Sequence, residues 1–301
     1  MASIKSWISA LRPRTLFLAV ATALCGSGLA YNTGKFDMAV FIFTILIATI
    51  LQLLSNLSND LGDYQHGTDI TGERVGPQRT VQSGAITPQQ MKRAILLAIV
   101  LAAIVGLVLI YIALQFMELK YIIAFLVLGA GCIIAAIKYT AGKNPYGYKG
   151  LGDIFSFTFF GLVSVVGTYF LHTHIVDFQP WLPAIGLGLL TVAVLNLNNM
   201  RDLENDRKSG KVTIPVRIGL YNAKIYHACL TLGALLCFAS YSILYSDRWY
   251  QYLYLFVFLL FIKMLINIFR IKENRLLDPY LKYTSMGTFI LSICFCICIN
   301  L

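Results

Sequence analysis

Residues 94–117 read AILLAIVLAAIVGLVLIYIALQFM and contain no charged side chain. About 20 consecutive apolar residues are enough for a helix to cross the hydrocarbon core of a bilayer, so this stretch predicts a transmembrane helix. Similar stretches recur along the chain, and the mean hydropathy of +0.72 agrees with a membrane protein. The sequence predicts nine spans, at residues 15–33, 38–58, 94–117, 121–137, 154–171, 178–200, 225–246, 249–269 and 283–301.

The segments between these spans are too short to hold a soluble domain. We therefore expect residues 1–301 to form one all-α domain, an integral membrane bundle of nine transmembrane helices with Asp-rich loops on the cytoplasmic side. All seven cysteines fall within the predicted spans. There a cysteine usually packs as a small apolar side chain, so we expect none of them to bind a metal.

Lys and Arg residues are divided unevenly between the two sides of the predicted bundle. The side that holds the N-terminus and the connections after spans two, four, six and eight carries 20 of the 24. The other side carries only Lys35, Lys120 and Arg248, and Lys263 lies within span eight. Because cytoplasmic loops carry such an excess, we expect the basic side to be cytoplasmic. The N-terminus is then cytoplasmic and the C-terminus lies on the opposite side.

Two acidic clusters, each at the cytoplasmic end of a span, are near copies of one another. The first cluster reads NLSNDLGD at 56–63, and the second cluster reads NNMRDLENDR at 198–207. Each places an Asn and two carboxylates at helical spacing, so these side chains share one face of a helix end. Hard oxygen ligands of this kind suit Mg²⁺ that carries substrate phosphates. Acidic loop residues that only face water are the weaker alternative, because two matched copies lie on the same side.

Membrane orientation and attraction to anionic lipid account for most of the positive charge of the chain. A separate group of basic residues lies close to the two clusters. They are Arg79, Arg207, Lys208, Lys211 and Arg217. Their position favours an anionic substrate. Although the net charge is +10, the chain has no soluble basic domain, and we expect no nucleic acid partner.

The second cluster resembles a motif of the UbiA superfamily of intramembrane prenyltransferases, and the resemblance extends over nearly the whole chain. The family pattern NxxxDxxxD is matched fully by Asn198, Asp202 and Asp206. The nine spans and the cytoplasmic position of both clusters are also similar to this family.

The first cluster matches the same pattern only in part. Asn59 and Asp63 match its first two positions, but the third position is not acidic, and Asp69 follows two residues later. Asn56 and Asp60 offer an overlapping register. The sequence therefore leaves open whether Asp60, Asp63 or Asp69 binds metal.

Further strings carry the resemblance. Tyr139 and Lys143 match the family's Tyr-xxx-Lys element, and residues 79–84 resemble its Arg-Pro-Leu-x-Ser-Gly segment, with Thr in place of Pro. The branch that prenylates 1,4-dihydroxy-2-naphthoate is most similar in the strings SNLSNDLGD (55–63), GPQR (76–79), PYGYKGLGD (145–153) and NNMRDLENDR (198–207). Another acceptor, such as 4-hydroxybenzoate, is the alternative.

This resemblance implies an Mg²⁺-dependent transfer of a polyprenyl group from polyprenyl diphosphate to 1,4-dihydroxy-2-naphthoate, with loss of the ring carboxylate, as in menaquinone biosynthesis. The implied partners are these two substrates and the lipid bilayer, and the implied location is the bacterial cytoplasmic (inner) membrane. The implied metal ligands are Asn59, Asp60, Asp63, Asn198, Asp202 and Asp206. The four Asp residues of this set are also expected to be catalytic, together with Lys143. The expected substrate-binding residues are Arg79, Tyr139, Asn59, Asn198, Asp153, Arg207, Lys211 and Arg14.

Three polar residues keep a second interpretation. Asp153 either stabilises the N-terminus of span five, where a carboxylate is favourable, or contacts the aromatic substrate. Arg14 is as compatible with an interfacial anchor as with a phosphate ligand. Lys263 lies about two turns inside span eight, where it either snorkels to the surface or faces the bundle interior.

Two functions of other classes fit parts of the pattern. A transporter of an anionic lipid or metabolite also needs charges in the membrane, but its key groups would lie near the midplane. Here they cluster at one membrane face, which favours the enzyme. A non-catalytic membrane partner protein would give no reason for a repeated Asp motif.

Overall fold

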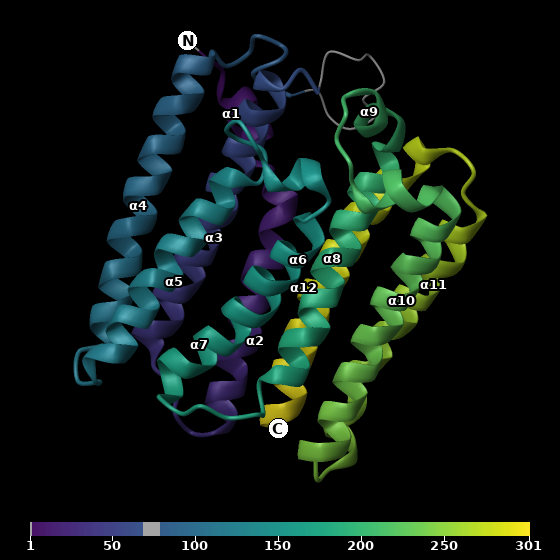
Figure 1. Ribbon diagram of the computed structural model, residues 1–301. Helices are drawn as coiled ribbons and strands as arrows, with labels where there is room; N and C mark the ends of the chain where they lie inside the picture. The colour runs from purple at the N-terminus through teal and green to yellow at the C-terminus, as the bar shows by residue number, and fades with distance from the viewer. Residues whose placement is uncertain (1, 69–78) are drawn as a thin grey trace.

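The computed structural model describes residues 2–68 and 79–301, and within these residues nine helical segments are long and apolar enough to cross a membrane. The segments run side by side as a bundle (Figure 1). This confirms the predicted all-α membrane bundle with nine spans. In chain order the elements are α1 (Ile4–Leu11), η1 (Pro13–Thr15), α2 (Leu16–Asn32), α3 (Met38–Gln65), α4 (Pro88–Leu114), α5 (Leu119–Lys138), η2 (Tyr146–Lys149), α6 (Gly152–Ser156), η3 (Phe157–Val163), α7 (Ser164–Thr173), α8 (Trp181–Arg201), α9 (Leu203–Lys208), α10 (Ile214–Tyr245), η4 (Trp249–Val257), α11 (Phe258–Arg270), η5 (Asn274–Leu277) and α12 (Asp278–Asn300).

The first cluster lies within a helix rather than in a loop. α3 continues beyond the predicted end of its span, at residue 58, as far as Gln65. A glycine in the left-handed conformation, Gly67 with a φ of 67°, then follows the helix end. Gly62 packs so closely on the segment after α5 that a Cβ there would come within 2.6 Å of the Thr140 backbone. The prediction of an Asp-rich loop is therefore wrong for residues 56–63.

The second cluster spans the junction between α8 and α9. Asn198 lies near the end of α8, Asp202 lies between the two helices, and Asp206 lies in α9. Gly210 has a φ of 74° and reverses the chain direction. As a result the backbone N–H of Lys211 donates to the carbonyl of Asp206 at 2.9 Å. The turn brings Lys211 back beside the second cluster.

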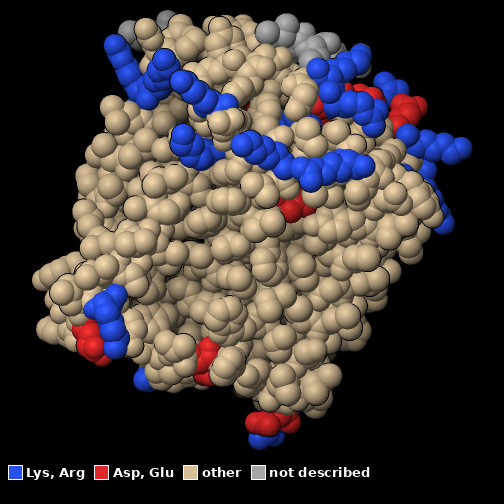
Figure 2. All heavy atoms as spheres, viewed as in Figure 1, with Lys and Arg blue, Asp and Glu red and all other residues tan. Residues whose placement is uncertain are grey.

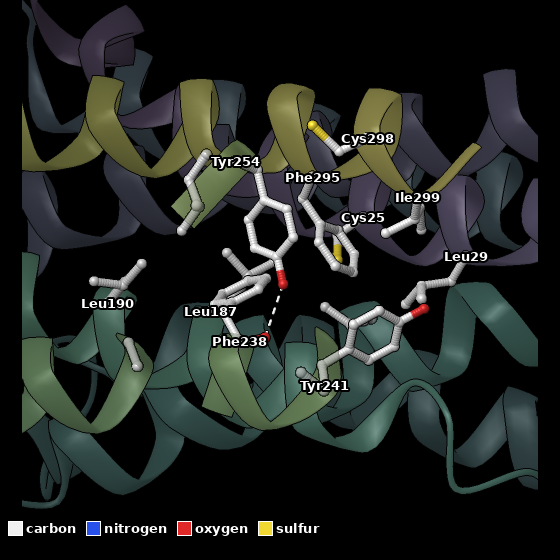
Figure 3. Packing of buried hydrophobic residues seen from close by; sticks show 14 of the residues in the cluster. Cys25, Leu29, Leu187, Leu190, Phe238, Tyr241, Tyr254, Phe295, Cys298 and Ile299 are labelled. Atoms are coloured by element: carbon white, nitrogen blue, oxygen red, sulfur yellow. Dashed lines mark hydrogen bonds between the residues drawn. The ribbon is translucent and has the colours of Figure 1, made fainter. Parts of the chain in front are cut away.

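An aromatic core holds the C-terminal helices together in the other half of the bundle. Phe295 of α12 packs edge to face on Phe238 and Tyr241 of α10 and on Tyr254 of η4, with ring centroids 5.0–5.2 Å apart (Figure 3). The Tyr254 hydroxyl donates to the Phe238 carbonyl at 2.7 Å. This buried cluster fixes α10, η4 and α12 relative to one another.

Span five is interrupted by a π-helical segment, η3, between α6 and α7. Such segments are wider than an α-helix and often occur at functional sites. Gly161 of this segment crosses Gly188 of α8 so closely that a Cβ at Gly161 would lie 2.7 Å from the Gly188 Cα. The close crossing presses η3 against α8, and Phe159, Phe160 and Val163 line the cavity beside it.

Basic side chains gather at one end of the bundle, the end that carries the N-terminus and α9, and few appear at the other end (Figure 2). Both acidic clusters lie toward this basic end. The surface therefore has the charge asymmetry that the sequence predicts.

Candidate functional site

A cavity of about 560 Å³ extends along the inside of the bundle, between α2, α3, α4, α5, η3 and α8. Most of its lining is apolar. Its polar lining residues at the basic end come from both halves of the chain, and they include Arg12, Gln52, Asn56, Asn59, Asp63, Arg79, Tyr139, Asn198 and Lys211. The cavity therefore has a charged end and a long apolar remainder.

Asp63 is the acidic residue of the first cluster that lines the cavity. Its carboxylate pairs with the Arg79 guanidinium, and its Oδ1 accepts from the Tyr148 hydroxyl at 3.0 Å. Asp63 and Arg79 are both buried. A buried ion pair of this kind requires hydrogen bonds to offset its desolvation, and Tyr148 supplies one of them.

Asp60, one turn earlier, faces a different part of the protein. Its Oδ2 accepts from the Thr80 backbone N–H at 3.1 Å and from the Thr80 hydroxyl at 2.9 Å, and its Oδ1 accepts from the Val81 N–H at 3.1 Å. Asp60 does not line the cavity. It holds the turn that carries Arg79, so the structure favours the register of Asn59 and Asp63 over that of Asp60. Asp69, the third candidate, lies outside the described residues.

In the second cluster, Asn198 lines the cavity, whereas Asp202 and Asp206 do not. Arg201 bridges Asn198 and Asp202, because its Nη2 donates to Asn198 Oδ1 at 2.9 Å and to Asp202 Oδ2 at 2.6 Å. The same guanidinium donates to Asp278 of α12 at 2.6 Å. Asp202 is thus committed to a buried ion pair with Arg201.

Asp206 and Lys211 form the second charged pair of the site. The Lys211 Nζ lies 3.5 Å from Asp206 Oδ1, and both side chains are buried. The second carboxylate oxygen of Asp206 is buried without a hydrogen bond. A buried acceptor without a hydrogen bond destabilises the folded state, and a bound cation would compensate for the missing hydrogen bond.

The two clusters share one electrostatic environment. Burial raises the pKa of Asp206 to about 6, the Lys211 charge opposes this, and the Asp202 and Asp63 charges add to it. Burial lowers the pKa of Lys211, but the nearby Asp206 and, more weakly, Tyr139 and Asp63 outweigh it, so that pKa is raised. Since Asp63 of the first cluster acts on both groups, the fold brings the clusters together. Burial also raises the pKa of Tyr139 to about 12.

Several predicted site residues lie away from the cavity. Lys143 is exposed in the turn after α5. Arg207 is exposed and pairs with Glu204 at 3.2 Å. Arg14 lies 3.7 Å from Asp278. None of these three cations lines the cavity, and the structure gives no support to a direct role of Lys143, Arg207 or Arg14 in it.

Asp153 and Lys263 are also outside the cavity lining. Asp153 is buried in α6, and its Oδ2 accepts from the Tyr226 hydroxyl of α10 at 2.9 Å. That contact ties α6 to α10, so Asp153 connects two helices. Lys263 is exposed on α11, which favours snorkelling over a place in the interior.

Two lining or contacting residues were missed by sequence reasoning. Arg12 lines the cavity, although Arg14 was the residue predicted. Its signal is the following Pro13, since a residue before proline is disfavoured in the helical conformation, which predicts a break at Arg12. Tyr148 bonds to Asp63, and it lies in the string 145–153, whose aromatic residues were not assigned a role.

The oxygen donors of the site fit Mg²⁺ that arrives with a diphosphate. Among the described residues no three His, Cys, Asp or Glu side chains lie close enough to form a cation site alone. Mg²⁺ usually keeps one or two protein carboxylates and takes its other ligands from phosphates and water. Asp63, which lines the cavity, is one such carboxylate. Asp206 is outside the lining, but its Oδ2 is buried without a hydrogen bond and its Oδ1 pairs with Lys211, which does line the cavity. Asn59 and Asn198 add amide oxygens at the cavity wall.

The chain matches the model of the UbiA prenyltransferase family over residues 19–278. It is 42% identical to a 1,4-dihydroxy-2-naphthoate octaprenyltransferase of Escherichia coli K12, over 97% of this chain and 94% of that relative. A 1,4-dihydroxy-2-naphthoate octaprenyltransferase of Mycobacterium tuberculosis is 35% identical over 79% of this chain and 78% of its own length.

Solved structures show the same fold. A UbiA homolog from Archaeoglobus fulgidus bound to DMAPP and Mg²⁺ superposes with a TM-score of 0.62 at 16% identity, over 97% of this chain and 99% of that one. A UbiA homolog from Aeropyrum pernix K1 superposes with a TM-score of 0.66 at 16% identity, over 92% and 98% of the two chains. With this fold, the family match and relatives that align along nearly the whole sequence, the chain belongs to the UbiA prenyltransferase family.

Proposed function

We propose that this protein transfers a polyprenyl group from polyprenyl diphosphate to 1,4-dihydroxy-2-naphthoate, with loss of the carboxylate as carbon dioxide, to give a demethylmenaquinol in menaquinone biosynthesis. The observation that carries this proposal is one cavity with a long apolar part and a charged end, which is lined by Asp63, Arg79 and Lys211 and by an Asn of each cluster, Asn59 and Asn198. The relatives at 42% and 35% identity carry the name of this activity. Both halves of residues 1–301 contribute to the cavity, which supports treating them as one domain.

The charged end suits the diphosphate of the donor. Bound Mg²⁺ would supply charge neutralisation of the leaving diphosphate, and Asn59, Asp63, Asn198 and Asp206 are its proposed ligands. Arg79 and Lys211 are buried cations that line the cavity, which supports a role in donating charge-assisted hydrogen bonds to phosphate oxygens. Because they are fixed by Asp63 and Asp206, they need little rearrangement as charge develops on the leaving group.

The wall beside the charged end suits an aromatic acceptor. Tyr139, Tyr146, Phe155 and Phe159 line this region of the cavity, and the Tyr146 and Phe155 rings stack with centroids 3.9 Å apart. A naphthalene ring gains contact area against such a wall. The apolar surroundings also exclude water, which would otherwise capture the allylic cation formed when the diphosphate leaves.

The isoprenoid tail is expected to occupy the apolar part of the cavity. Gly129 of α5 lines it, whereas Gly131 does not, and a Cβ added at either position meets no atom within 4 Å. Gly129→Trp should therefore fill the tail path without distorting the helix, and Gly131→Trp is its matched control. We expect Gly129→Trp to lower kcat/KM for a long polyprenyl diphosphate by about tenfold or more, as expected when misplacement of the reacting carbon costs rate.

The measurement compares a long donor with dimethylallyl diphosphate in both variants. A short donor leaves the tail path empty, so Gly129→Trp should spare it. Equal losses on both donors, or a larger effect of Gly131→Trp, would place the tail elsewhere.

The choice of acceptor tests the proposed function. Pure protein with Mg²⁺ and a polyprenyl diphosphate should convert 1,4-dihydroxy-2-naphthoate and give little product with 4-hydroxybenzoate. The second ring adds apolar contact, and a loosely held smaller ring loses alignment with the cation. Mass spectrometry of the products decides. Comparable turnover of both acids would refute the acceptor assignment, and the absence of any prenylated product would refute the enzyme and favour a transporter.

We infer that the charged end of the cavity opens to the cytoplasm. The excess of Lys and Arg at that end supports this orientation. In a cysteine-free background, a cysteine at exposed Lys143 should react with an impermeant thiol reagent only in inside-out vesicles, and one at exposed Lys35 only in intact cells. The reversed pattern would overturn the orientation.

A further inference from the structure

Tyr148 contacts charged residues from both halves of the site, although it does not line the cavity itself. Its hydroxyl donates to Asp63 Oδ1 of the first cluster at 3.0 Å. Its backbone carbonyl accepts from the N–H of Val212, the residue after Lys211, at 3.0 Å. The Lys211 Nζ lies 5.8 Å from the centroid of the Tyr148 ring, within the range of a cation–π interaction. One residue thus touches both Asp63 and Lys211.

The backbone around Tyr148 is held on two sides. The Gly147 N–H donates to the Tyr139 carbonyl at 2.9 Å, and a Cβ at Gly147 would lie 2.6 Å from that carbonyl oxygen. Gly150 has a φ of 76°, and a Cβ there would lie 2.9 Å from the Val212 carbonyl oxygen. Both approaches are too close for a side chain larger than hydrogen. η2 is therefore packed between the end of α5 and the turn after α9, and Tyr148 is fixed between them.

The Asp63 carboxylate is held at both of its oxygens. Its Oδ2 pairs with the Arg79 guanidinium, and its Oδ1 accepts the Tyr148 proton. A phenol has a single proton, so the Thr68 hydroxyl, which also contacts the phenol oxygen, donates to it. Donors on both oxygens fix the plane of the carboxylate. Each oxygen has further acceptor capacity, so Asp63 can still accept from the cavity that it lines.

We propose that Tyr148 is a positioning residue that holds Asp63 and Lys211 in a fixed relative arrangement for the diphosphate of the donor, a role that rests on the proposed function. These two residues are far apart in the chain, and both line the cavity. Charged groups that are already in place need no rearrangement as charge develops on the leaving group. The hydroxyl of Tyr148 acts on the Asp63 side of the site, and its ring and backbone act on the Lys211 side.

The hydroxyl is tested with Tyr148→Phe, which keeps the ring and its volume. We expect kcat to fall about tenfold, the effect of losing one hydrogen bond to a charged group, while the KM for the aromatic acceptor stays unchanged. Because the hydroxyl acts through Asp63, adding Tyr148→Phe to Asp63→Asn should cost little further activity, as for residues that act as a coupled pair. Thermal unfolding in detergent checks that each variant folds.

Tyr169→Phe is the matched control. Tyr169 of α7 also donates its hydroxyl to a carboxylate, that of Asp177 at 3.3 Å, and it does not line the cavity. Its substitution removes the same chemical group toward the end of the bundle opposite to α9 (Figure 1). We therefore expect kcat of Tyr169→Phe to stay close to that of the wild type. An equal loss of kcat in Tyr169→Phe and Tyr148→Phe would show a general effect on stability and overturn the proposal.

The ring is tested with Tyr148→Leu, which also removes the contact with Lys211. Isothermal titration calorimetry with magnesium pyrophosphate, without an acceptor, measures binding at the charged end. We expect Tyr148→Leu to raise the Kd about tenfold and Tyr148→Phe to raise it less. Tyr148→Phe alone carries the test where Tyr148→Leu does not fold.

The outcomes separate this role from the proposed function. An unchanged Kd in both Tyr148 variants would overturn the role of Tyr148, as would a full additional loss of kcat when Tyr148→Phe is combined with Asp63→Asn. A rise in the acceptor KM alone would assign Tyr148 to the acceptor and overturn it too. Wild-type protein that does not bind magnesium pyrophosphate would instead refute the diphosphate site of the proposed function, and the Tyr148 proposal with it.

Discussion

Asp63→Asn is expected to lower kcat by about 10²-fold or more, the usual effect of removing a group that stabilises charge in the transition state. The substitution keeps the shape of the side chain but removes its charge. Asp63 pairs with buried Arg79 and faces the cavity, so both the Arg79 guanidinium and the proposed metal lose a partner. The rate of pyrophosphate release by pure protein at saturating substrate concentrations measures this loss.

Asp60→Asn is the matched control, since both residues are buried on α3. Asp60 accepts three hydrogen bonds from Thr80 and Val81, and an amide nitrogen cannot accept. The melting temperature of Asp60→Asn should therefore decrease, whereas its kcat should fall much less than that of Asp63→Asn. A large loss of kcat for Asp60→Asn with an unchanged melting temperature, and no loss for Asp63→Asn, would reverse the register of the first cluster.

Lys211→Met is expected to lower kcat/KM for the donor by about 10²-fold or more. The methionine fills a similar volume but leaves Asp206 buried without its counter-ion. Burial already raises the Asp206 pKa to about 6 despite Lys211, so loss of the cation would raise that pKa further and favour a protonated carboxyl. The variant thus loses a phosphate contact and weakens a proposed metal ligand together.

The comparison for Lys211→Met is Arg207→Gln. Arg207 is exposed and bound to Glu204, so its substitution should leave kcat/KM close to that of the wild type. Steady-state kinetics with varied donor concentration gives both values. A larger effect at Arg207 than at Lys211 would show that the donor approaches from the surface of α9 and not through the cavity.

The first cluster shows what the sequence could predict and where it stopped. Helical spacing predicts that its Asn and its two carboxylates share one face of a helix end, and the residues do lie near the end of α3. Asp60 and Asp63 nevertheless face different parts of the protein, because the rotation of α3 decides which of them faces the cavity. That rotation is set by contacts distant in the chain, with the turn at Thr80 and with Thr140 against Gly62.

The basic residues around the second cluster illustrate a second limit. Arg207 and Lys211 lie four residues apart, and the sequence predicts both as substrate-binding cations. The reversal at Gly210 sends the Lys211 side chain inward and leaves Arg207 outside. Likewise, Arg201 and Asp202 are adjacent in the sequence, but the pairing of Arg201 with Asp278 depends on the position of α12. Spans and motifs are local properties, whereas these assignments depend on tertiary packing.

The most direct test of the account follows the carboxyl carbon of the acceptor. Pure protein is supplied with Mg²⁺, a polyprenyl diphosphate and 1,4-dihydroxy-2-naphthoate that is isotopically labelled in its carboxyl carbon. We predict that label appears in carbon dioxide in a one-to-one ratio with released pyrophosphate and is absent from the prenylated product. A prenylated product that retains the label, or pyrophosphate release without labelled carbon dioxide, would contradict the proposed reaction.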